Sequence, residues 1–223
     1  MIHDPDPDSA AFVTAHTIVA TTPLVPEIRL HLATEITPLW EAVEAAVGQT
    51  NQPPPYWAFA WVGGQAMARH ILDHPHLVRG RRVLDFAAGC GIGAIACALA
   101  GAAHVTANEI DPFAAAAIRL NAALNGVAVE VVVADLVGGG QVGAWDVVTA
   151  GDVCYERPMA SKVEPWLLAL ASGGATVLLA DPGRAYLPSR GLVPLARHTV
   201  PTTRELEDRD RRDTTIYRLE SVG

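Results

Sequence analysis

The sequence predicts a doubly wound α/β fold, in which a seven-stranded sheet follows an N-terminal helical extension. From residue 81 onward, short apolar runs that suit buried strands alternate with longer runs that suit helices, a pattern typical of a parallel sheet between helices. Two strand-like segments then end the chain at 192–200 and 214–220. The 223 residues suit one domain, with the extension at 1–75 and the core at 76–223.

The extension is the less regular part of the chain. Residues 4–8 alternate acid and proline, which predicts a frayed tail, and residues 10–25 leave room for a short strand. Apolar side chains at near-helical spacing predict a helix over 27–47, with an interruption at Pro38. An aromatic loop followed by a helix is expected at 57–72.

The core follows a regular order. Its predicted strands are 82–86, 104–108, 130–134, 145–150 and 175–180, and its predicted helices are 93–100, 112–124 and 158–170. The last two strands of the chain form a hairpin. Residues 204–213 carry charges of both signs, so we expect them to be the solvated turn of that hairpin.

Composition narrows the class of protein. Half of the residues are apolar, but no apolar run reaches the ~20 residues of a membrane span, and the acidic N-terminus does not resemble a secretion signal. The three cysteines lack metal-binding spacing, which predicts reduced thiols in a cytoplasmic protein without a metal site. A net charge of −8 argues against nucleic acid as the partner and is compatible with a cationic substrate.

A glycine-rich turn joins the first strand of the core to its helix. Gly89, Gly91 and Gly93 stand at every second position, and Asp85 lies four residues before them at the strand end. Glycines allow a tight turn and a close approach to a ligand, and the helix start offers free N–H groups. This pattern predicts a loop that binds a nucleotide cofactor.

The glycines alone leave the cofactor open. With Ala94 in the last place they also satisfy the dinucleotide fingerprint, so an NAD enzyme or a non-catalytic binding protein stays an alternative. Asp85 favours S-adenosylmethionine, because a carboxylate there can hold the amino-acid end of that cofactor but would oppose a pyrophosphate.

Acids also follow the next two strands. Glu109 lies 24 residues beyond Asp85, near the ~20-residue offset of a ribose-binding acid, and its carboxylate can accept from both ribose hydroxyls. Asp111 precedes Pro112 and is expected to cap a helix. Asp135 ends the third strand, where it either accepts from the adenine amino group or caps its own loop.

The fourth strand ends in the sequence Gly-Asp-Val-Cys-Tyr-Glu. Open α/β sheets bind ligands at the carboxyl ends of their strands, so we expect Asp152, Tyr155 and Glu156 near the reacting atoms. The alternative makes Asp152 a turn residue and Tyr155 a packing residue. No histidine adjoins Cys154 in sequence, which argues against covalent catalysis.

Aromatic residues and histidines precede the core. Trp57 is expected to pack on the cofactor or to line the substrate channel, whereas Phe59 and Trp61 are interpreted as core residues. The three histidines between residues 70 and 76 are interpreted as a solvated helix end.

Together, the glycine-rich loop, Glu109 and the pattern Asp152-x-x-Tyr155 resemble the class I, seven-β-strand protein methyltransferases that share a D-x-x-Y signature. The resemblance implies a Rossmann-like sheet and S-adenosylmethionine as methyl donor. The segments 55–65, 152–156 and 181–184 are further similar to the electron transfer flavoprotein β-subunit lysine methyltransferases. The resemblance runs from about residue 14 to the end of the chain.

The resemblance implies N-methylation of lysine in the electron transfer flavoprotein β subunit. Asp152 and Glu156 would then recruit the ammonium group, and Tyr155 would orient its nitrogen. A small-molecule N-methyltransferase acting on a nicotinamide-like amine and a ribosomal-protein methyltransferase stay as alternatives. The absence of Asn-Pro-Pro-Tyr after the fourth strand argues against methylation of nucleic acid bases or glutamine.

Overall fold

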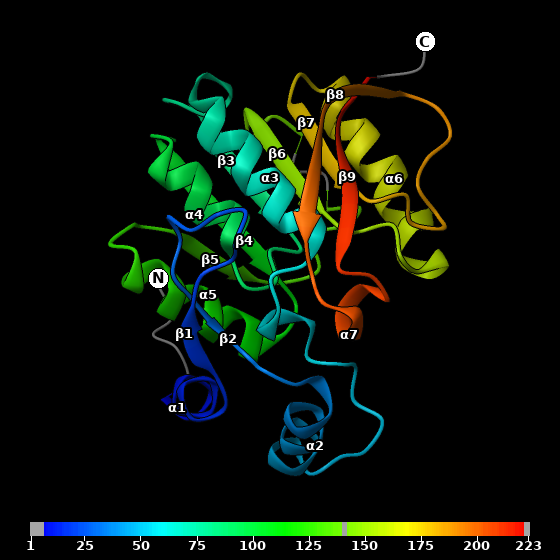
Figure 1. The fold of residues 1–223 in the computed structure, drawn as a ribbon. Coiled ribbons are helices and arrows are strands. Elements are labelled where there is room, and N and C mark those ends of the chain that lie inside the picture. The colour runs from blue at the N-terminus through cyan, green and yellow to red at the C-terminus, as the bar shows by residue number, and fades with distance from the viewer. Residues whose placement is uncertain (1–6, 140–141, 221–223) are drawn as a thin grey trace.

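The structure, a computed structural model, describes residues 7–139 and 142–220. A seven-stranded mixed sheet forms its centre, and five neighbouring strands pair in parallel (Figure 1). In spatial order the strands are β5 (Glu130–Val133), β4 (His104–Glu109), β3 (Arg82–Phe86), β6 (Val147–Gly151), β7 (Thr176–Asp181), β9 (Arg211–Leu219) and β8 (Leu192–Pro201). β9 is antiparallel to both of its neighbours.

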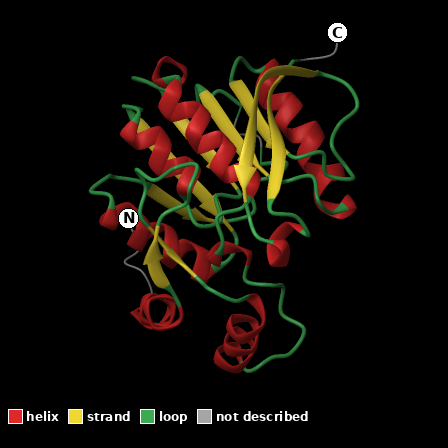
Figure 2. Ribbon diagram, in the orientation of Figure 1, coloured by secondary structure: helices red, strands yellow, loops and turns green. Residues whose placement is uncertain are grey.

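Helices cover both faces of this sheet (Figure 2). Val83 of β3 packs with α3 (Val62–Asp73) and α4 (Ile92–Leu99), and Leu84 packs with α6 (Arg157–Ser172) on the other face. Successive residues of a strand point to opposite faces, so one strand supplies both cores. The doubly wound α/β class predicted from the sequence is confirmed, and the core elements begin and end within three residues of their predicted bounds.

α3 is part of this layered core, although it lies in the 1–75 segment that the sequence assigned to the extension. Its Met67 and Ile71 are fully buried in the cluster that α4 and the sheet form. The division into 1–75 and 76–223 stays a prediction.

The extension departs from its predicted elements. α1 (Pro7–His16) and β1 (Ile18–Ala20) come first, and β1 pairs with β2 (Leu30–Leu32). The helix predicted over 27–47 is therefore wrong in its first third, because Leu30 is buried in a strand and α2 covers only Ile36–Val47. Pro38 does not interrupt α2, because it lies in the first helical turn, where its missing N–H has no intrahelical partner.

Two further expectations need correction near the chain ends. Residues 4–6 of the predicted tail lie outside the described residues. Pro7 and Asp8, the rest of that segment, belong to α1. The turn predicted as solvated at 204–213 contains the short helix α7 (Arg204–Glu207), whose Glu207 side chain is only 2% exposed.

The histidines of α3 are likewise less solvated than expected. His70 is buried, and its ring lies 4.5 Å from that of His74. Burial, with the neighbouring His74 and His198, lowers the pKa of His70 to about 4. The interpretation as a solvated helix end is wrong for His70, because α3 turns this face toward β8.

No helix in the described part of the chain is long and apolar enough to cross a membrane.

Candidate active site

Except for Trp57, the predicted site residues lie at or just after the carboxyl ends of β3, β4, β5 and β6, which meet on one side of the sheet. Asp85 is the innermost of them. Its Oδ1 accepts a hydrogen bond from Thr149 Oγ1 at 2.8 Å, and a Cβ added at Gly93 would lie 2.8 Å from its Oδ2. Gly93 therefore lets the start of α4 sit directly on this carboxylate. Burial raises the pKa of Asp85 to about 6, against the effect of the Thr149 hydroxyl.

The β3–α4 loop (residues 87–91) holds its glycines for two different reasons. Gly89 has φ +56°, and a Cβ there would meet nothing within 4 Å. Gly91 has φ +80°, and a Cβ there would press on Ile118 of α5 (Pro112–Leu124) at 3.1 Å. Gly89 thus faces open space that a ligand can use, whereas Gly91 is required by packing. Ala87 adopts φ 52°, a left-handed conformation that costs a non-glycine residue energy.

Glu109 at the end of β4 binds this loop. Its Oε1 accepts the Gly89 N–H at 2.7 Å and its Oε2 accepts the Ile110 N–H at 3.1 Å. Burial raises the pKa of this carboxyl. Asp111 caps α5 through the Phe113 N–H at 2.7 Å, as the sequence predicted.

Asp135 caps its own loop, because its Oδ1 accepts a hydrogen bond from the Val137 N–H at 3.0 Å. It also lines a cavity of about 630 Å³ together with Lys162 and Trp166 of α6. The loop-capping alternative is therefore present in the structure, and the contact with adenine stays a prediction.

The β6–α6 loop (residues 152–156) starts with a strained residue. Asp152 has φ 55°, and its side chain is 12% exposed. Oδ2 accepts the Gly63 N–H of α3 at 2.5 Å, and Oδ1 accepts from Arg184 at 2.8 Å. Burial raises the pKa of Asp152 to about 6, and the positive charge of Arg184 limits the rise.

The same loop carries an aromatic rim. Tyr155 is 38% exposed, its ring centroid lies 5.6 Å from that of Tyr56, and Tyr56 lies 5.7 Å from Trp61. Burial, with Glu156, Tyr56 and Glu109 nearby, raises the pKa of Tyr155 to about 12, so its phenol is neutral. Glu156 is exposed at the start of α6.

Cys154, between these residues, is buried, and burial raises its thiol pKa to about 12. A protonated thiol is a poor nucleophile, which agrees with the absence of covalent catalysis in the predicted mechanism.

Relatives of this chain show which family the site belongs to. A relative from Xenopus laevis is 39% identical over 215 residues, which cover 94% of this chain and 86% of the relative, and it is named electron transfer flavoprotein beta subunit lysine methyltransferase. Relatives of the same name from Danio rerio and Mus musculus are 37% and 36% identical, over 90% and 91% of this chain. The chain belongs to the electron transfer flavoprotein β-subunit lysine methyltransferase family.

Two broader comparisons concern part of the chain and the fold. A family model described as ribosomal protein L11 methyltransferase (PrmA) matches residues 66–153, from α3 to the β6–α6 loop. A proposed RNA methyltransferase from Pyrococcus horikoshii has a TM-score of 0.56 at 16% identity, covering 82% of this chain and 98% of that one. Magnesium protoporphyrin IX methyltransferase from Synechocystis with bound SAM has a TM-score of 0.51 at 20% identity, covering 71% and 81%. These structures share the predicted fold.

Trp57 lies in a different part of the molecule from the other predicted site residues. It is 2% exposed and its ring stacks on Phe113 at 6.3 Å, in a cluster with Val13 and Leu39 of the extension. The packing that we expected for Phe59 is observed, whereas Trp61 is partly exposed and donates its Nε1–H to Tyr56 O. A contact between Trp57 and the cofactor stays a prediction.

Sequence reasoning missed three side chains at this edge. Ile110 is 72% exposed directly after Glu109, and its only sequence signal is an apolar residue after a strand-terminal acid. Arg184 contacts Asp152, and Glu207 in turn contacts Arg184. Arg184 lies in the segment 181–184 that carries the family resemblance, but its contact with Asp152 was not predicted, and no pattern near Asp152 signals Glu207.

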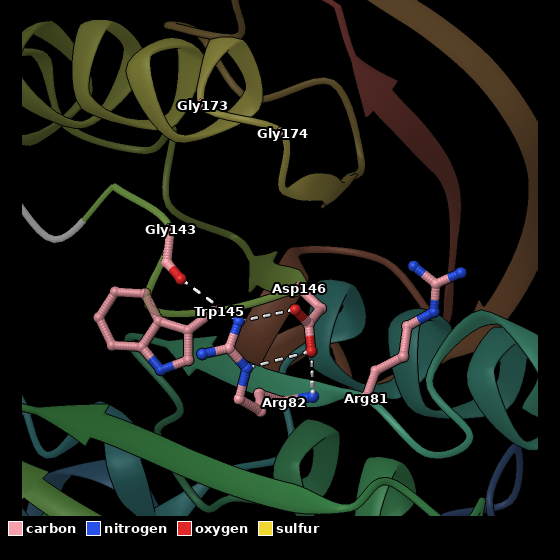
Figure 3. A pocket seen from close by; sticks show the side chains of 7 residues that line it. All are labelled: Arg81, Arg82, Gly143, Trp145, Asp146, Gly173 and Gly174. Carbon is pink, nitrogen blue, oxygen red and sulfur yellow. Dashed lines mark hydrogen bonds and ion pairs between the residues drawn. The ribbon is translucent and has the colours of Figure 1, made fainter.

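The opposite edge of the sheet carries a second hollow of about 420 Å³ (Figure 3). Arg81, Arg82, Trp145 and Asp146 are among its lining residues, where β3 and β6 begin. Asp146 forms an ion pair with the Arg82 guanidinium at 2.8 Å. Ligands of open α/β sheets bind at the other edge, so this hollow is not the candidate site.

Proposed function

We propose that this chain transfers a methyl group from S-adenosylmethionine to lysine side chains of the electron transfer flavoprotein β subunit. The observation that carries the proposal is the relationship over 94% of the chain to proteins named for that reaction. The relationship includes the edge of the sheet at which the predicted acids and Tyr155 meet.

S-adenosylmethionine as cofactor agrees with the family and with the residues present. Open space beside Gly89 leaves room for a ligand, and the exposed Ile110 offers an apolar surface for a base. Asp85, Gly91 and Gly93 would form the floor of the cofactor site, Glu109 would accept from the ribose hydroxyls, and Asp135 would accept from the adenine amino group. When bound, the cofactor supplies a methyl group on a positively charged sulfur.

The β6–α6 loop would receive the amine. Lysine has a pKa near ~10.4 in water, so its nitrogen must lose a proton to solvent water before it can attack. We propose that the exposed Glu156 attracts the ammonium group and that the neutral phenol of Tyr155 orients the nitrogen, while Asp152, whose oxygens accept from Gly63 and Arg184, fixes the loop that carries them. Alignment can supply ~7–11 kcal/mol of a barrier, so placement of the nitrogen is the main contribution expected from these residues.

A ribosomal protein is the second candidate substrate. The match of residues 66–153 to the ribosomal protein L11 methyltransferase model favours it, but relatives of that name are 39% identical over only 37% of this chain. The electron transfer flavoprotein β subunit is therefore the better-supported substrate. We also propose a cytoplasmic location, because all three cysteines are free and buried.

The test is a comparison of substrates for one enzyme preparation. Purified chain and labelled S-adenosylmethionine are mixed with the electron transfer flavoprotein β subunit, with ribosomal protein L11 or with nicotinamide. We expect label on lysines of the β subunit, located by peptide mass spectrometry. Label on L11 or nicotinamide with none on the β subunit would contradict the proposal.

A further inference from the structure

Asp152 belongs to a buried network of four charged side chains. Arg184 reaches Asp152 Oδ1 with Nε at 3.2 Å and with a terminal nitrogen at 2.8 Å. The same guanidinium contacts both oxygens of Glu207, at 3.0 and 2.5 Å. Arg212 forms an ion pair with Glu207 at 3.3 Å. Two cations thus balance two carboxylates, and the four side chains are 25% exposed or less.

The network is built by parts of the chain that are remote in sequence. Asp181 Oδ1 accepts the N–H groups of Gly183 and Arg184, at 2.7 and 2.6 Å, and so fixes the turn that presents Arg184. Glu207 comes from α7, which lies between the β8–β9 hairpin and α2 (Figure 1). Glu205 of the same helix accepts the Ile36 N–H at the start of α2.

Asp152 needs such support because its backbone is strained. A left-handed conformation is unfavourable for aspartate, and strained residues persist only where their surroundings hold them. Arg184 from one side and the α3 N–H of Gly63 from the other fix both carboxylate oxygens. The Tyr186 N–H also donates to Cys154 O at 3.2 Å, which joins the Arg184 turn to the β6–α6 loop.

We propose that Arg184 and Glu207 are positioning residues for methyl transfer: the Arg184–Glu207 pair holds Asp152, and with it the loop that carries Tyr155 and Glu156, in the geometry that receives the amine. This inference rests on the proposed function. Arginine suits the role because its planar fork contacts two carboxylates at once.

The test uses the full chain with Arg184→Gln, Glu207→Gln and the control Arg197→Gln. Arg197 pairs with Asp213 on the same hairpin, but both side chains are largely exposed, at 69% and 48%. Single-turnover transfer to the β subunit is measured at saturating cofactor, beside S-adenosylhomocysteine calorimetry and a thermal melt. We expect Arg184→Gln and Glu207→Gln to lose at least thirtyfold in transfer per folded molecule, with cofactor affinity within threefold of wild type. Arg197→Gln should match wild type.

The pH dependence of the transfer rate distinguishes a positioning role from a loss of folded protein. The charges that act on Asp152 are Arg184, which lowers its pKa, and Glu207, which raises it, beside the α3 start at Gly63. Arg184→Gln should therefore move the acidic limb of the transfer rate to higher pH, and Glu207→Gln should move it to lower pH. Loss of transfer only in proportion to unfolding, or shifts of the same sign, would overturn the proposal.

Hydrogen exchange keeps this inference apart from the choice of substrate. Amides of residues 152–156 should exchange at least tenfold faster in Arg184→Gln than in wild type or Arg197→Gln, while those of the β3–α4 loop stay unchanged. If wild type fails to methylate the β subunit, the proposed function fails. If amides 152–156 exchange at the wild-type rate in Arg184→Gln, the Arg184–Glu207 pair does not hold the loop.

Discussion

The β3–α4 loop and the β6–α6 loop lie at the same edge of the sheet, but they are held in different ways. The first is fixed by neighbours from β3, β4 and α5: Asp85 beneath it, Glu109 on the Gly89 amide and Ile118 against Gly91. The second is held through one carboxylate by groups from α3, the loop after β7 and α7. The β3–α4 loop thus presents open backbone for a ligand, and the β6–α6 loop presents side chains whose placement depends on remote contacts.

The difference suggests a division of labour. Open space at Gly89 suits cofactor binding, and the rim of Tyr155 and Glu156 suits the incoming amine. Substitutions in the two loops should therefore separate cofactor affinity from methyl transfer.

The largest effect is expected at the β6–α6 loop. Asp152→Asn keeps the size of the side chain but loses the charge that pairs with Arg184. We expect methyl transfer to fall a hundredfold or more, on the order of 3 kcal/mol of transition-state positioning, with the fold and most of the cofactor affinity retained. Single-turnover transfer beside a thermal melt measures both. A lower melting temperature with normal turnover per folded molecule would make Asp152 a purely structural residue.

Gly89→Asn tests the other loop. Asparagine tolerates a left-handed backbone better than most residues, and its side chain would enter the open space beside Gly89. Affinity for S-adenosylhomocysteine should fall at least tenfold in calorimetry, with little change in melting temperature. Wild-type affinity in the folded variant would show that the ligand does not approach Gly89.

Glu109→Ala should have an intermediate effect. The substitution removes an acceptor for the ribose and also releases the Gly89 amide. Affinity for S-adenosylhomocysteine should weaken by about 1–3 kcal/mol. Asp111→Ala is the matched control, since Asp111 only caps α5; it should lower the melting temperature and leave cofactor affinity unchanged.

The last prediction concerns the stability of the fold and its dependence on pH. The pKa of Asp85 is about 6 in the folded chain and near 3.9 in an unfolded one, so the folded state binds the proton more tightly. Its contribution to stability is complete below pH ~4 and is lost as the pH rises through ~6, on the order of 3 kcal/mol in total. Asp85→Asn removes this dependence.

Urea unfolding at pH 4.5 and 7.5 measures that change. The stability of Asp85→Asn relative to wild type should be greater at pH 7.5 than at pH 4.5, because only wild type loses stability as the carboxyl group ionises. If the difference in unfolding free energy between Asp85→Asn and wild type does not change with pH, the pKa of Asp85 does not lie between these two pH values in the folded chain.

The two loops also differ in how far the sequence predicts them. Asp85, the glycines and Glu109 form a pattern of local spacing, and the structure places them together because adjacent parallel strands end at one edge. The D-x-x-Y pattern similarly predicts that Asp152 and Tyr155 share a loop. The contacts of Asp152 were not predictable from local spacing. Arg184 comes from the segment after β7, and Glu207, which holds Arg184, comes from a hairpin turn whose charges suggest a solvated segment. The role of Trp57 stays a prediction, because an aromatic run next to glycines suits a ligand wall and a buried core equally well.

The most direct test of this division measures both properties on one preparation each of wild type, Gly89→Asn and Asp152→Asn. Calorimetry gives the affinity for S-adenosylhomocysteine, and single-turnover transfer to the electron transfer flavoprotein β subunit at saturating cofactor gives the rate. We expect Gly89→Asn to lose affinity but to stay within tenfold of the wild-type rate, and Asp152→Asn to bind normally but transfer at least a hundredfold more slowly. Equal losses of affinity and rate in both variants would contradict the division between the two loops.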